Sequence, residues 1–373
     1  MKINKLNVYY QKKKVGTLAN LDKYRIAFQY DDEWIQNGFS ISPFSLPLKK
    51  DVFISNKPYF NGLFGVFSDS LPDAWGNILL NRVIRKHGLN IDELNTLDRL
   101  AIIGNSGMGA LTYQPEFLHF EEIDKINLDE IAQECYLILT SEYNDNLDVL
   151  FKLGGSSGGA RPKILTKIND EDWIIKFPAH TDSKDIGIME YDYYKCALNC
   201  GINMSESKLF DSKISSGYFG TKRFDRKNNE RIHMVSAAGL LEIDFRQPSL
   251  DYHTLMKLTK IITRDNLFDL EQLFRIMCFN VFAHNRDDHA KNFTYLYNEN
   301  EHRWHLSPAY DLTFSTTYFG EHTTSVDNNG LNPNRKELLN VGLKAGLKKN
   351  KCLNILDEIE SKVNEQLSKY IKK

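Results

Sequence analysis

The sequence predicts an α+β fold with a small N-terminal α/β subdomain, a strand-rich middle part and a mostly helical C-terminal lobe. Residues 24–30 (YRIAFQY) alternate between polar and apolar side chains, which is typical of a half-buried strand. A glycine-rich run at 153–163 precedes further strand-like segments, whereas residues 267–282 and 353–363 carry apolar groups at helical spacing. At 373 residues, the chain is long enough for two or three packed units.

We expect three parts along the chain. Residues 1–115 would form the N-terminal subdomain, residues 116–226 a linker helix and a lobe built on the glycine-rich run, and residues 227–373 a helical lobe. The linker helix is expected at 127–140. Another helix follows Pro72, and its predicted apolar face comprises Trp75, Ile78, Leu79, Val83 and Ile84.

Composition favours a globular protein of the cytoplasm. Hydrophobic residues make up 42% and charged residues 26%, and no apolar run approaches the ~20 residues of a membrane span. The N-terminus alternates like a strand and does not resemble a signal peptide. The net charge is −2 and basic residues are interleaved with acidic ones, so we expect no basic face for direct DNA binding. Five scattered cysteines argue against a disulfide framework, and Cys196 and Cys200 are expected to pack in the core.

The glycine-rich run Leu153–Lys163 (LGGSSGGARPK) is a candidate phosphate-binding loop. Its four glycines leave backbone N–H groups free to face phosphate oxygens. Such runs are commonly linkers, but here two strand-like segments follow, Lys163–Thr166 and Trp173–Pro178, with turn-forming Asn169-Asp170 between them. No Gly-Lys-Ser/Thr closes the run, so it is not a Walker sequence.

Lys176 lies on the second of these strands among apolar neighbours. In this position an ammonium group would be held toward the α- and β-phosphates of a nucleotide. Its candidate partner is Glu190, on a segment with helical character at 188–194. The alternative for Glu190 is a solvated carboxylate on the outside of that helix.

The most informative segment is Ala283–Phe293 (AHNRDDHAKNF), followed by Pro308–Asp311 (PAYD). Asp287 comes just after the expected helix 267–282, and Asn292 follows five residues later. Phosphoryl transfer from ATP uses a carboxylate to orient the accepting hydroxyl, while an amide and a second carboxylate hold divalent metals. Asp311 supplies that second carboxylate in the required order.

Asp311 is far from Asn292 in sequence, and a hairpin would bring the two together. Residues 293–297 and 304–306 are typical strands, and the polar residues between them form a turn. Because a hairpin folds back on itself, we expect Asp311 to return to the neighbourhood of Asn292.

Each of these polar residues could also have a purely structural role or belong to a different kind of site. Asp and Asn in loops usually cap helices or form turns, although that does not account for the ordered combination. His284 and His289 with Asp287 and Asp288 could instead ligate the metal of a hydrolase, but their spacing is not that of a helical zinc pair. We expect His289 to brace the loop.

Taken together, these segments resemble the HipA-like serine/threonine kinase family, the toxin component of bacterial toxin–antitoxin pairs. The resemblance covers most of the chain, and the motifs follow in the family's order. They are Phe64–Gly76 (FGVFSDSLPDAWG), Ile103–Leu111 (IGNSGMGAL), the glycine-rich run, Lys176, Arg223–Arg226 (RFDR), the loop from Asp287 to Asn292, and Tyr310-Asp311. The resemblance implies a bilobal protein-kinase-like fold that uses ATP and magnesium.

The family's roles carry over to the matching positions of this chain. The resemblance implies Asp287 as the catalytic base, with Asn292 and Asp311 as magnesium ligands. It implies that nucleotide is bound by Gly158, Gly159, Ala160, Arg161, Pro162, Lys163, Lys176, Lys222, Arg223, Phe224, His289, Lys291, Asn292, Tyr310 and Asp311. Two positions depart from the family: Arg161 stands where many relatives carry Gln, and Lys222 where many carry Glu. The resemblance assigns the adenine contact to the segment Lys222–Phe224.

The resemblance also implies regulation and partners. Members phosphorylate a serine in their own glycine-rich loop, which silences the kinase; the matching residue is Ser156, with Ser157 beside it as a second acceptor. A helix-turn-helix antitoxin would bind the chain and supply its only contact with DNA. The protein substrate would be an aminoacyl-tRNA synthetase or another translation component, as for relatives.

Two other functions remain open from the sequence. The same three metal-and-base residues would also serve a small-molecule or lipid kinase. A catalytically silent interaction protein bound to an antitoxin is the non-enzyme alternative. Retention of Lys176, Asp287, Asn292 and Asp311 argues against it, since a decayed site need not keep all four.

Overall fold

The computed structural model describes residues 2–22, 24–117, 126–140, 147–155, 158–317 and 319–371. The chain divides into two compact units. The first comprises Met1–Gly187, Leu209–Val235 and Gly239–Ile243, and the second Ile188–Lys208, Ser236–Ala238 and Asp244–Lys373. The predicted boundaries near 115 and 226 stay predictions. Among the described residues, no helix combines the length and the apolar character needed to cross a membrane.

The N-terminal part of the first unit is a five-stranded sheet in the order β4-β3-β2-β1-β5. All of its pairings are antiparallel. Leu6, Leu18 and Phe28 lie opposite one another on three adjacent strands and are fully buried, so one row of apolar side chains crosses the sheet. Its strands are β1 (Lys5–Tyr10), β2 (Lys13–Asn20), β3 (Ile26–Tyr30), β4 (Val52–Ser55) and β5 (Leu111–Gln114).

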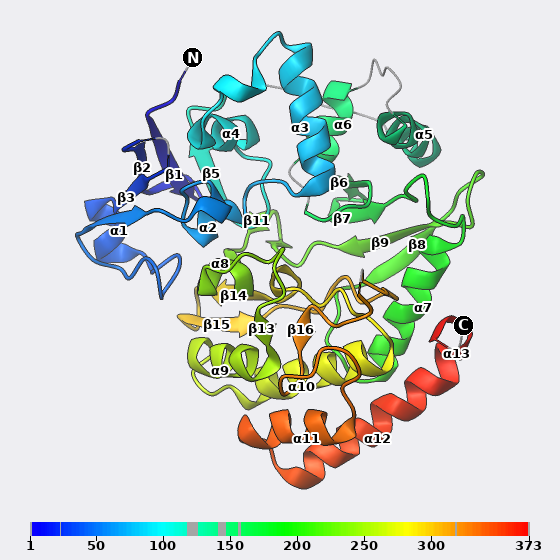
Figure 1. Ribbon diagram of the computed structural model, residues 1–373. Coiled ribbons are helices and arrows are strands. Elements are labelled where there is room, and N and C mark those ends of the chain that lie inside the picture. The colour runs from blue at the N-terminus through cyan, green and yellow to red at the C-terminus, as the bar shows by residue number, and fades with distance from the viewer. Residues whose placement is uncertain are drawn as a thin grey trace. The chain divides into compact units, whose positions relative to one another are not determined.

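Helices connect this sheet to the strands that follow the glycine-rich run. In Figure 1, α3 runs beside α6, and α6 packs against β6. Trp75 and Leu79 of α3, Leu150 of α6 and Ile164 of β6 belong to one buried apolar cluster. The helices of this unit are α1 (Asp32–Asn37), η1 (Pro58–Phe60), α2 (Gly65–Ser68), α3 (Ala74–Lys86), η2 (Ile91–Glu93), α4 (Thr96–Ile103), α5 (Leu128–Leu139) and α6 (Leu147–Gly154).

The predicted linker helix and the helix after Pro72 are therefore present as α5 and α3. The prediction for Ile78 was wrong in part, because its side chain is exposed whereas Trp75, Leu79, Val83 and Ile84 are buried. Ile78 lies at the edge of the apolar stripe, where an amphipathic helix meets solvent.

The second sheet has the order β6-β7-β9-β8. The predicted strands after the glycine-rich run are β6 (Lys163–Ile168) and β7 (Glu171–Lys176), and an antiparallel register places Lys163 opposite Lys176. Asn169 and Asp170 between them both have positive φ, as a two-residue hairpin turn requires. The other strands of this part are β8 (Ser207–Phe210), β9 (Tyr218–Lys222), β10 (Arg226–Lys227), β11 (Glu230–Arg231) and β12 (Met234–Ser236).

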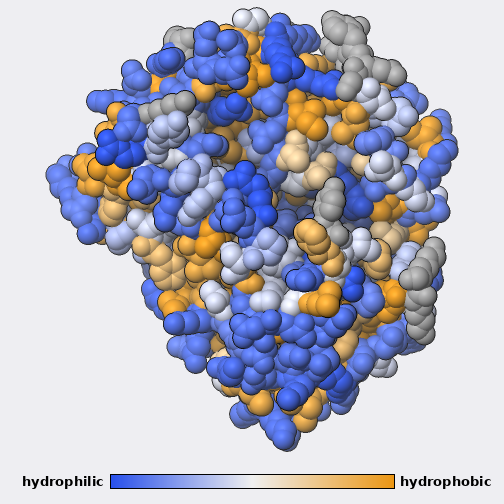
Figure 2. Space-filling model, in the orientation of Figure 1, coloured by the Kyte–Doolittle hydropathy of each residue, from blue (hydrophilic) through white to orange (hydrophobic). Residues whose placement is uncertain are grey.

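The second unit is mostly helical. Figure 1 shows α10, α11 and α12 packed side by side, and Figure 2 shows predominantly polar side chains on the visible surface over α11 and α12. The predicted helix at 267–282 is α10. Its spacing predicted one buried face, of which Phe282 is only half-buried, and Ile276, Cys278 and Phe279 outside that face are buried as well. The predicted face comprised Leu270, Leu273, Phe274, Met277, Val281 and Phe282. A helix that is apolar nearly all round forms the centre of a unit and not its surface.

The helix α10 packs against α9, α11, α12 and β15. The remaining elements of the chain are α7 (Ile186–Asn199), α8 (Ala237–Leu241), β13 (Leu250–Asp251), α9 (Tyr252–Ile262), α10 (Leu267–Phe282), η3 (Ala290–Asn292), β14 (Thr294–Asn298), β15 (Arg303–Leu306), β16 (Thr324–Ser325), α11 (Arg335–Lys344), α12 (Lys349–Gln366) and α13 (Ser368–Ile371). Strands β14 and β15 form the predicted antiparallel hairpin, and β13 pairs with β16 in parallel.

Candidate active site

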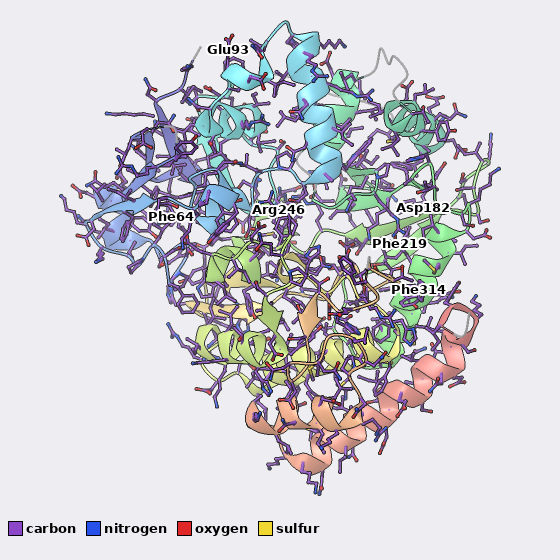
Figure 3. All side chains as sticks on the ribbon, in the orientation of Figure 1. Phe64, Glu93, Asp182, Phe219, Arg246 and Phe314 are labelled. Carbon is purple, nitrogen blue, oxygen red and sulfur yellow. The ribbon has the colours of Figure 1, made fainter. Side chains whose placement is uncertain are left out.

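Two lysines lie directly opposite each other at the end of the β6–β7 hairpin in the first unit. Lys163 is 7% exposed, and the Nζ of Lys176 lies 5.6 Å from the ring centroid of Phe219, which Figure 3 labels. Two ammonium groups placed in this way could offset the charge of an anion bound at this end of the hairpin.

Gly158 and Gly159, at the end of the glycine-rich run, are anchored to the start of α3. The Gly159 N–H donates to Asp73 Oδ2 over 3.3 Å, and the Gly159 carbonyl accepts the N–H of Trp75 over 3.1 Å. Gly159 has φ +83°, and a Cβ there would lie 2.9 Å from Lys163 Nζ. The Lys163 ammonium could move away from a Cβ, so it is the positive φ that favours glycine at this position. Ser156 and Ser157 lie outside the described residues.

Arg161 is held in place by an acidic partner that the sequence did not reveal. Its Nε and one terminal nitrogen donate to the two oxygens of Asp182, over 2.9 and 3.2 Å. The Ala179 N–H also donates to Asp182, which Figure 3 labels. A two-point contact of this kind fixes the guanidinium plane. The adjacent Pro162 is buried, whereas Ala160 is exposed.

The predicted adenine-contacting segment, Lys222–Phe224, continues from β9. The Lys222 ammonium lies 2.5 Å from Glu171 and 5.6 Å from the ring centroid of Trp173, so its side chain belongs to the sheet. The Arg223 N–H donates to the Asp172 carbonyl. Any contact of Lys222 with adenine would therefore come from its backbone.

Arg223 and Arg226 both contact a buried carboxylate, Asp225. Arg223 donates to both of its oxygens, Arg226 donates to Oδ2 over 2.8 Å, and the Gly109 N–H donates to Oδ2 over 2.7 Å. Burial raises the pKa of Asp225, but Arg223 and Arg226 outweigh it and hold that pKa well below its usual range. Burial lowers the pKa of Arg226 to about 9 and that of Arg231 to about 10.

The second unit holds the predicted base and metal ligands. Asp287 follows the end of α10, and its side chain is 60% exposed. The Asn292 side-chain N–H donates to the Asp287 carbonyl over 2.6 Å, which leaves the amide oxygen of Asn292 as a ligand. The predicted bracing role of His289 is confirmed, since its Nδ1 accepts the Lys291 N–H and caps η3.

The β14–β15 hairpin brings Asp311 back to this loop, as predicted. The hydroxyl of Tyr310 donates to the Lys291 carbonyl over 2.5 Å and lies 2.6 Å from Thr294 Oγ1. Asp311 has φ +53°, a conformation that Asp tolerates better than most residues. The residues that flank Asp311 and Asn292 in sequence are therefore hydrogen-bonded to each other.

Asp288 differs sharply from its neighbour Asp287. It is 1% exposed and accepts hydrogen bonds from Tyr252 and from the backbone of Thr324. A carboxylate enclosed in this way cannot reach a substrate hydroxyl. The geometry thus favours Asp287 as the base.

The hydrolase-type metal site gains no support. Within the described part of the chain, no three His, Cys, Asp or Glu side chains gather as a metal site would require. The pKa of His284 is lowered by burial and then by the nearby Arg286 and His322. The backbone of His284 lies in the left-handed region.

Glu190 lies on α7 and is 4% exposed. The alternative of a solvated carboxylate was therefore wrong. A buried carboxylate needs a partner, and the pairing of Glu190 with Lys176 stays a prediction. Cys196 and Cys200, further along α7, are buried free thiols, as expected of core residues.

Several residues of the site were missed by sequence reasoning. They include Asp73, Asp182, Tyr252, Asn280, His322 and Thr324. Two of them gave a signal: Asp73 lies within the family-like motif at 64–76, and Asn280 is a polar residue inside the apolar run of α10. The other four depend on long-range contacts that no spacing rule reveals.

Comparison with protein-family models decides the family. Residues 155–367 match the HipA-like C-terminal domain, and residues 6–114 match the HipA N-terminal domain. The chain belongs to the HipA-like family. A search of curated proteins found no significant match.

Solved structures agree with this assignment. HipA of Shewanella oneidensis MR-1, solved with HipB and operator DNA, is similar over 98% of this chain and 91% of its own, with a TM-score of 0.74 and 18% identity. A proinflammatory kinase of Helicobacter pylori, CtkA, matches 56% of this chain and 91% of its own, at a TM-score of 0.39 and 15% identity. The HipA match confirms the predicted mixed α and β fold class.

Proposed function

We propose that this HipA-like chain is an ATP- and Mg²⁺-dependent serine/threonine protein kinase that acts as the toxin of a toxin–antitoxin pair. The observation that carries the proposal is the loop cluster of the second unit. There an exposed Asp287 carboxylate, the Asn292 amide and Asp311 are tied together by hydrogen bonds and by the hairpin. These are the groups that phosphoryl transfer requires.

The residues fit both cofactors. Asn292 and Asp311 offer amide and carboxylate oxygens, which Mg²⁺ prefers, and Mg²⁺ would neutralise charge on the transferring phosphoryl group. Opposed Lys163 and Lys176, together with a glycine at 159 whose positive φ suits a phosphate-binding loop, fit the phosphates of ATP.

Each residue would have a defined task. Asp287 would orient the acceptor hydroxyl and take its proton, and its exposure leaves it accessible to a protein substrate. Lys163 and Lys176 would offset phosphate charge. His289 holds the backbone of the loop in shape through η3.

The direct test is phosphate transfer from radiolabelled ATP to a protein acceptor by the purified chain. Asp287→Asn should reduce the rate by ~10²–10⁴-fold while nucleotide binding is retained, because only the proton-accepting carboxylate is lost. Asp265→Asn, an exposed carboxylate of the same unit, is the matched control. Full activity in Asp287→Asn would remove Asp287 from the mechanism, and label on a small-molecule or lipid acceptor alone would exclude a protein kinase.

We further propose that Ser156 or Ser157 is phosphorylated by the chain itself. A phosphoserine carries ≈ −1.5 to −2 charges at neutral pH, in the run where ATP phosphates would bind. Like-charge repulsion would then oppose nucleotide binding and silence the kinase. Peptide mass spectrometry should find this phosphate in the wild type and not in Asp287→Asn; equal phosphate in both would contradict self-modification.

For partners, we propose a helix-turn-helix antitoxin, and DNA contact through that antitoxin alone. The S. oneidensis relative was solved with HipB and operator DNA, and the present chain has a net charge of −2. We propose a cytoplasmic location and a substrate in translation, such as an aminoacyl-tRNA synthetase. Gel shifts should show operator binding only when the antitoxin is added, and tight specific binding by the chain alone would contradict this.

A further inference from the structure

Three consecutive backbone carbonyls around Asp287 are each held by another residue of the second unit. The Arg286 carbonyl accepts both the N–H and the hydroxyl of Thr323, over 3.0 and 3.1 Å. The Asp287 carbonyl accepts from Asn292, and the Asp288 carbonyl accepts the Thr324 hydroxyl. The backbone of this loop is therefore fixed while the Asp287 side chain projects into solvent.

The side chain of Asp288 completes this arrangement. Its Oδ1 accepts the Thr324 N–H over 3.0 Å, so Thr324 of β16 contacts both the backbone and the carboxylate of Asp288. Its Oδ2 accepts the Tyr252 hydroxyl over 2.9 Å and lies 3.1 Å from His322 Nδ1. Burial, reinforced by the charge of Asp288, raises the pKa of Tyr252 well above its usual value, so this hydroxyl remains a donor.

The same network continues to the predicted metal ligand. Asn280 of α10 donates to the Tyr252 hydroxyl over 3.0 Å, and its own side-chain oxygen accepts from Asn285 over 2.9 Å. The Asn285 amide also contacts the Asp311 carbonyl, at 3.4 Å. One chain of hydrogen bonds thus runs from Asp288 to the backbone of Asp311.

We propose that Asp288 is a positioning residue, whose hydrogen bonds hold the backbone on either side of Asp287 in the geometry that phosphoryl transfer needs. Through Tyr252 and Asn280 the network also fixes the separation between Asp287 and Asp311. Buried polar groups of this kind can often be replaced by apolar ones without loss of stability, so their benefit here is geometric. Misplacement of a catalytic group by about 1 Å can cost ~100-fold in rate.

Two buried tyrosines of the second unit provide a matched pair for the test. Tyr252 and Tyr295 are both fully buried and each makes a hydroxyl contact, Tyr252 with Asp288 and Tyr295 with Thr259 over 2.7 Å. Tyr252→Phe and Tyr295→Phe therefore remove similar atoms from similar surroundings. Only Tyr252→Phe removes a hydrogen bond to Asp288.

The experiment combines amide hydrogen exchange with steady-state kinetics. Tyr252→Phe and Asp288→Asn should speed exchange across residues 284–292, and Tyr295→Phe should not. The turnover number should fall ~10-fold in Tyr252→Phe and ~100-fold in Asp288→Asn, with KM for ATP changed by less than ~3-fold. Tyr295→Phe should keep the wild-type turnover number.

Unchanged exchange across 284–292 in both network variants would overturn the proposal, as would an equal loss of turnover in Tyr295→Phe. The expected changes in turnover number rest on the proposed kinase function, but the expected changes in amide hydrogen exchange do not. A wild type that transfers no phosphate would reject the proposed function, and the exchange comparison would still decide whether Asp288 holds this loop.

Discussion

Asp225 in the first unit and Asp288 in the second are both buried carboxylates, but they are stabilised in opposite ways. Asp225 is surrounded by charge, with Arg223 and Arg226 donating to its oxygens. Asp288 receives a tyrosine hydroxyl and a backbone N–H, with His322 beside it.

The two sets of contacts have different structural effects. The arginines around Asp225 also bind backbone carbonyls of the predicted motif at 103–111: Arg226 and Arg231 both donate to Gly107 and Gly109. These ion pairs and hydrogen bonds link residues 223–231 to residues 103–111, which are far away in the sequence. Around Asp288, directional bonds from polar groups define where a short loop lies. The first region should therefore respond most in stability, and the second most in rate.

The largest expected effect on stability is at Asp225. Asp225→Ala should lower the free energy of unfolding by ~3–5 kcal/mol, because it leaves buried guanidinium groups without their carboxylate. Urea unfolding at neutral pH measures this, with the exposed Asp211→Ala as control. A loss no greater than that of Asp211→Ala would show that the carbonyls of Gly107 and Gly109 suffice to hold the arginines.

Acid should act on the same site. The folded pKa of Asp225 lies below its unfolded value of about 3.9, so its ionised form stabilises the fold. That contribution is complete above ~pH 4 and is lost as pH falls toward the folded pKa, at ~1.4 kcal/mol per unit of depression. Urea unfolding from pH 7 to pH 3 should show a steeper loss in wild type than in Asp225→Asn. If the free energy of unfolding fell equally with pH in wild type and in Asp225→Asn, the acid sensitivity would not come from Asp225.

The smallest expected effect concerns the opposed lysines. Lys176→Met removes one of the two ammonium groups at opposed positions of β6 and β7. The same change should weaken ATP binding, as measured by calorimetry. Lys167→Met on β6, whose ammonium contacts Asn229 at the surface, is the control. Equal ATP affinity in Lys176→Met and wild type would show that Lys176 does not bind the phosphates of ATP.

Much of the fold could be predicted because its signals are local. The run at 267–282 has helical periodicity and forms α10 with the predicted bounds, and Asn169-Asp170 forms the expected turn. The prediction that α10 buries one face failed for a physical reason. Periodicity locates a helix, but how much of its circumference is covered depends on neighbours such as α9 and α12, which no local pattern specifies.

For the candidate site, the sequence by itself predicted which residues would carry the chemistry, and it determined that a hairpin returns Asp311 toward Asn292, since type and order of residues are local information. Only the tertiary structure shows that Asp287 is exposed and that Asp288 is enclosed. Two adjacent aspartates have the same chemistry, and their difference arises because Tyr252 and Thr324, each 36 residues away, enclose one carboxylate and leave the other exposed. Burial is a property of the packed chain, so neighbouring identical side chains acquire different environments only on folding.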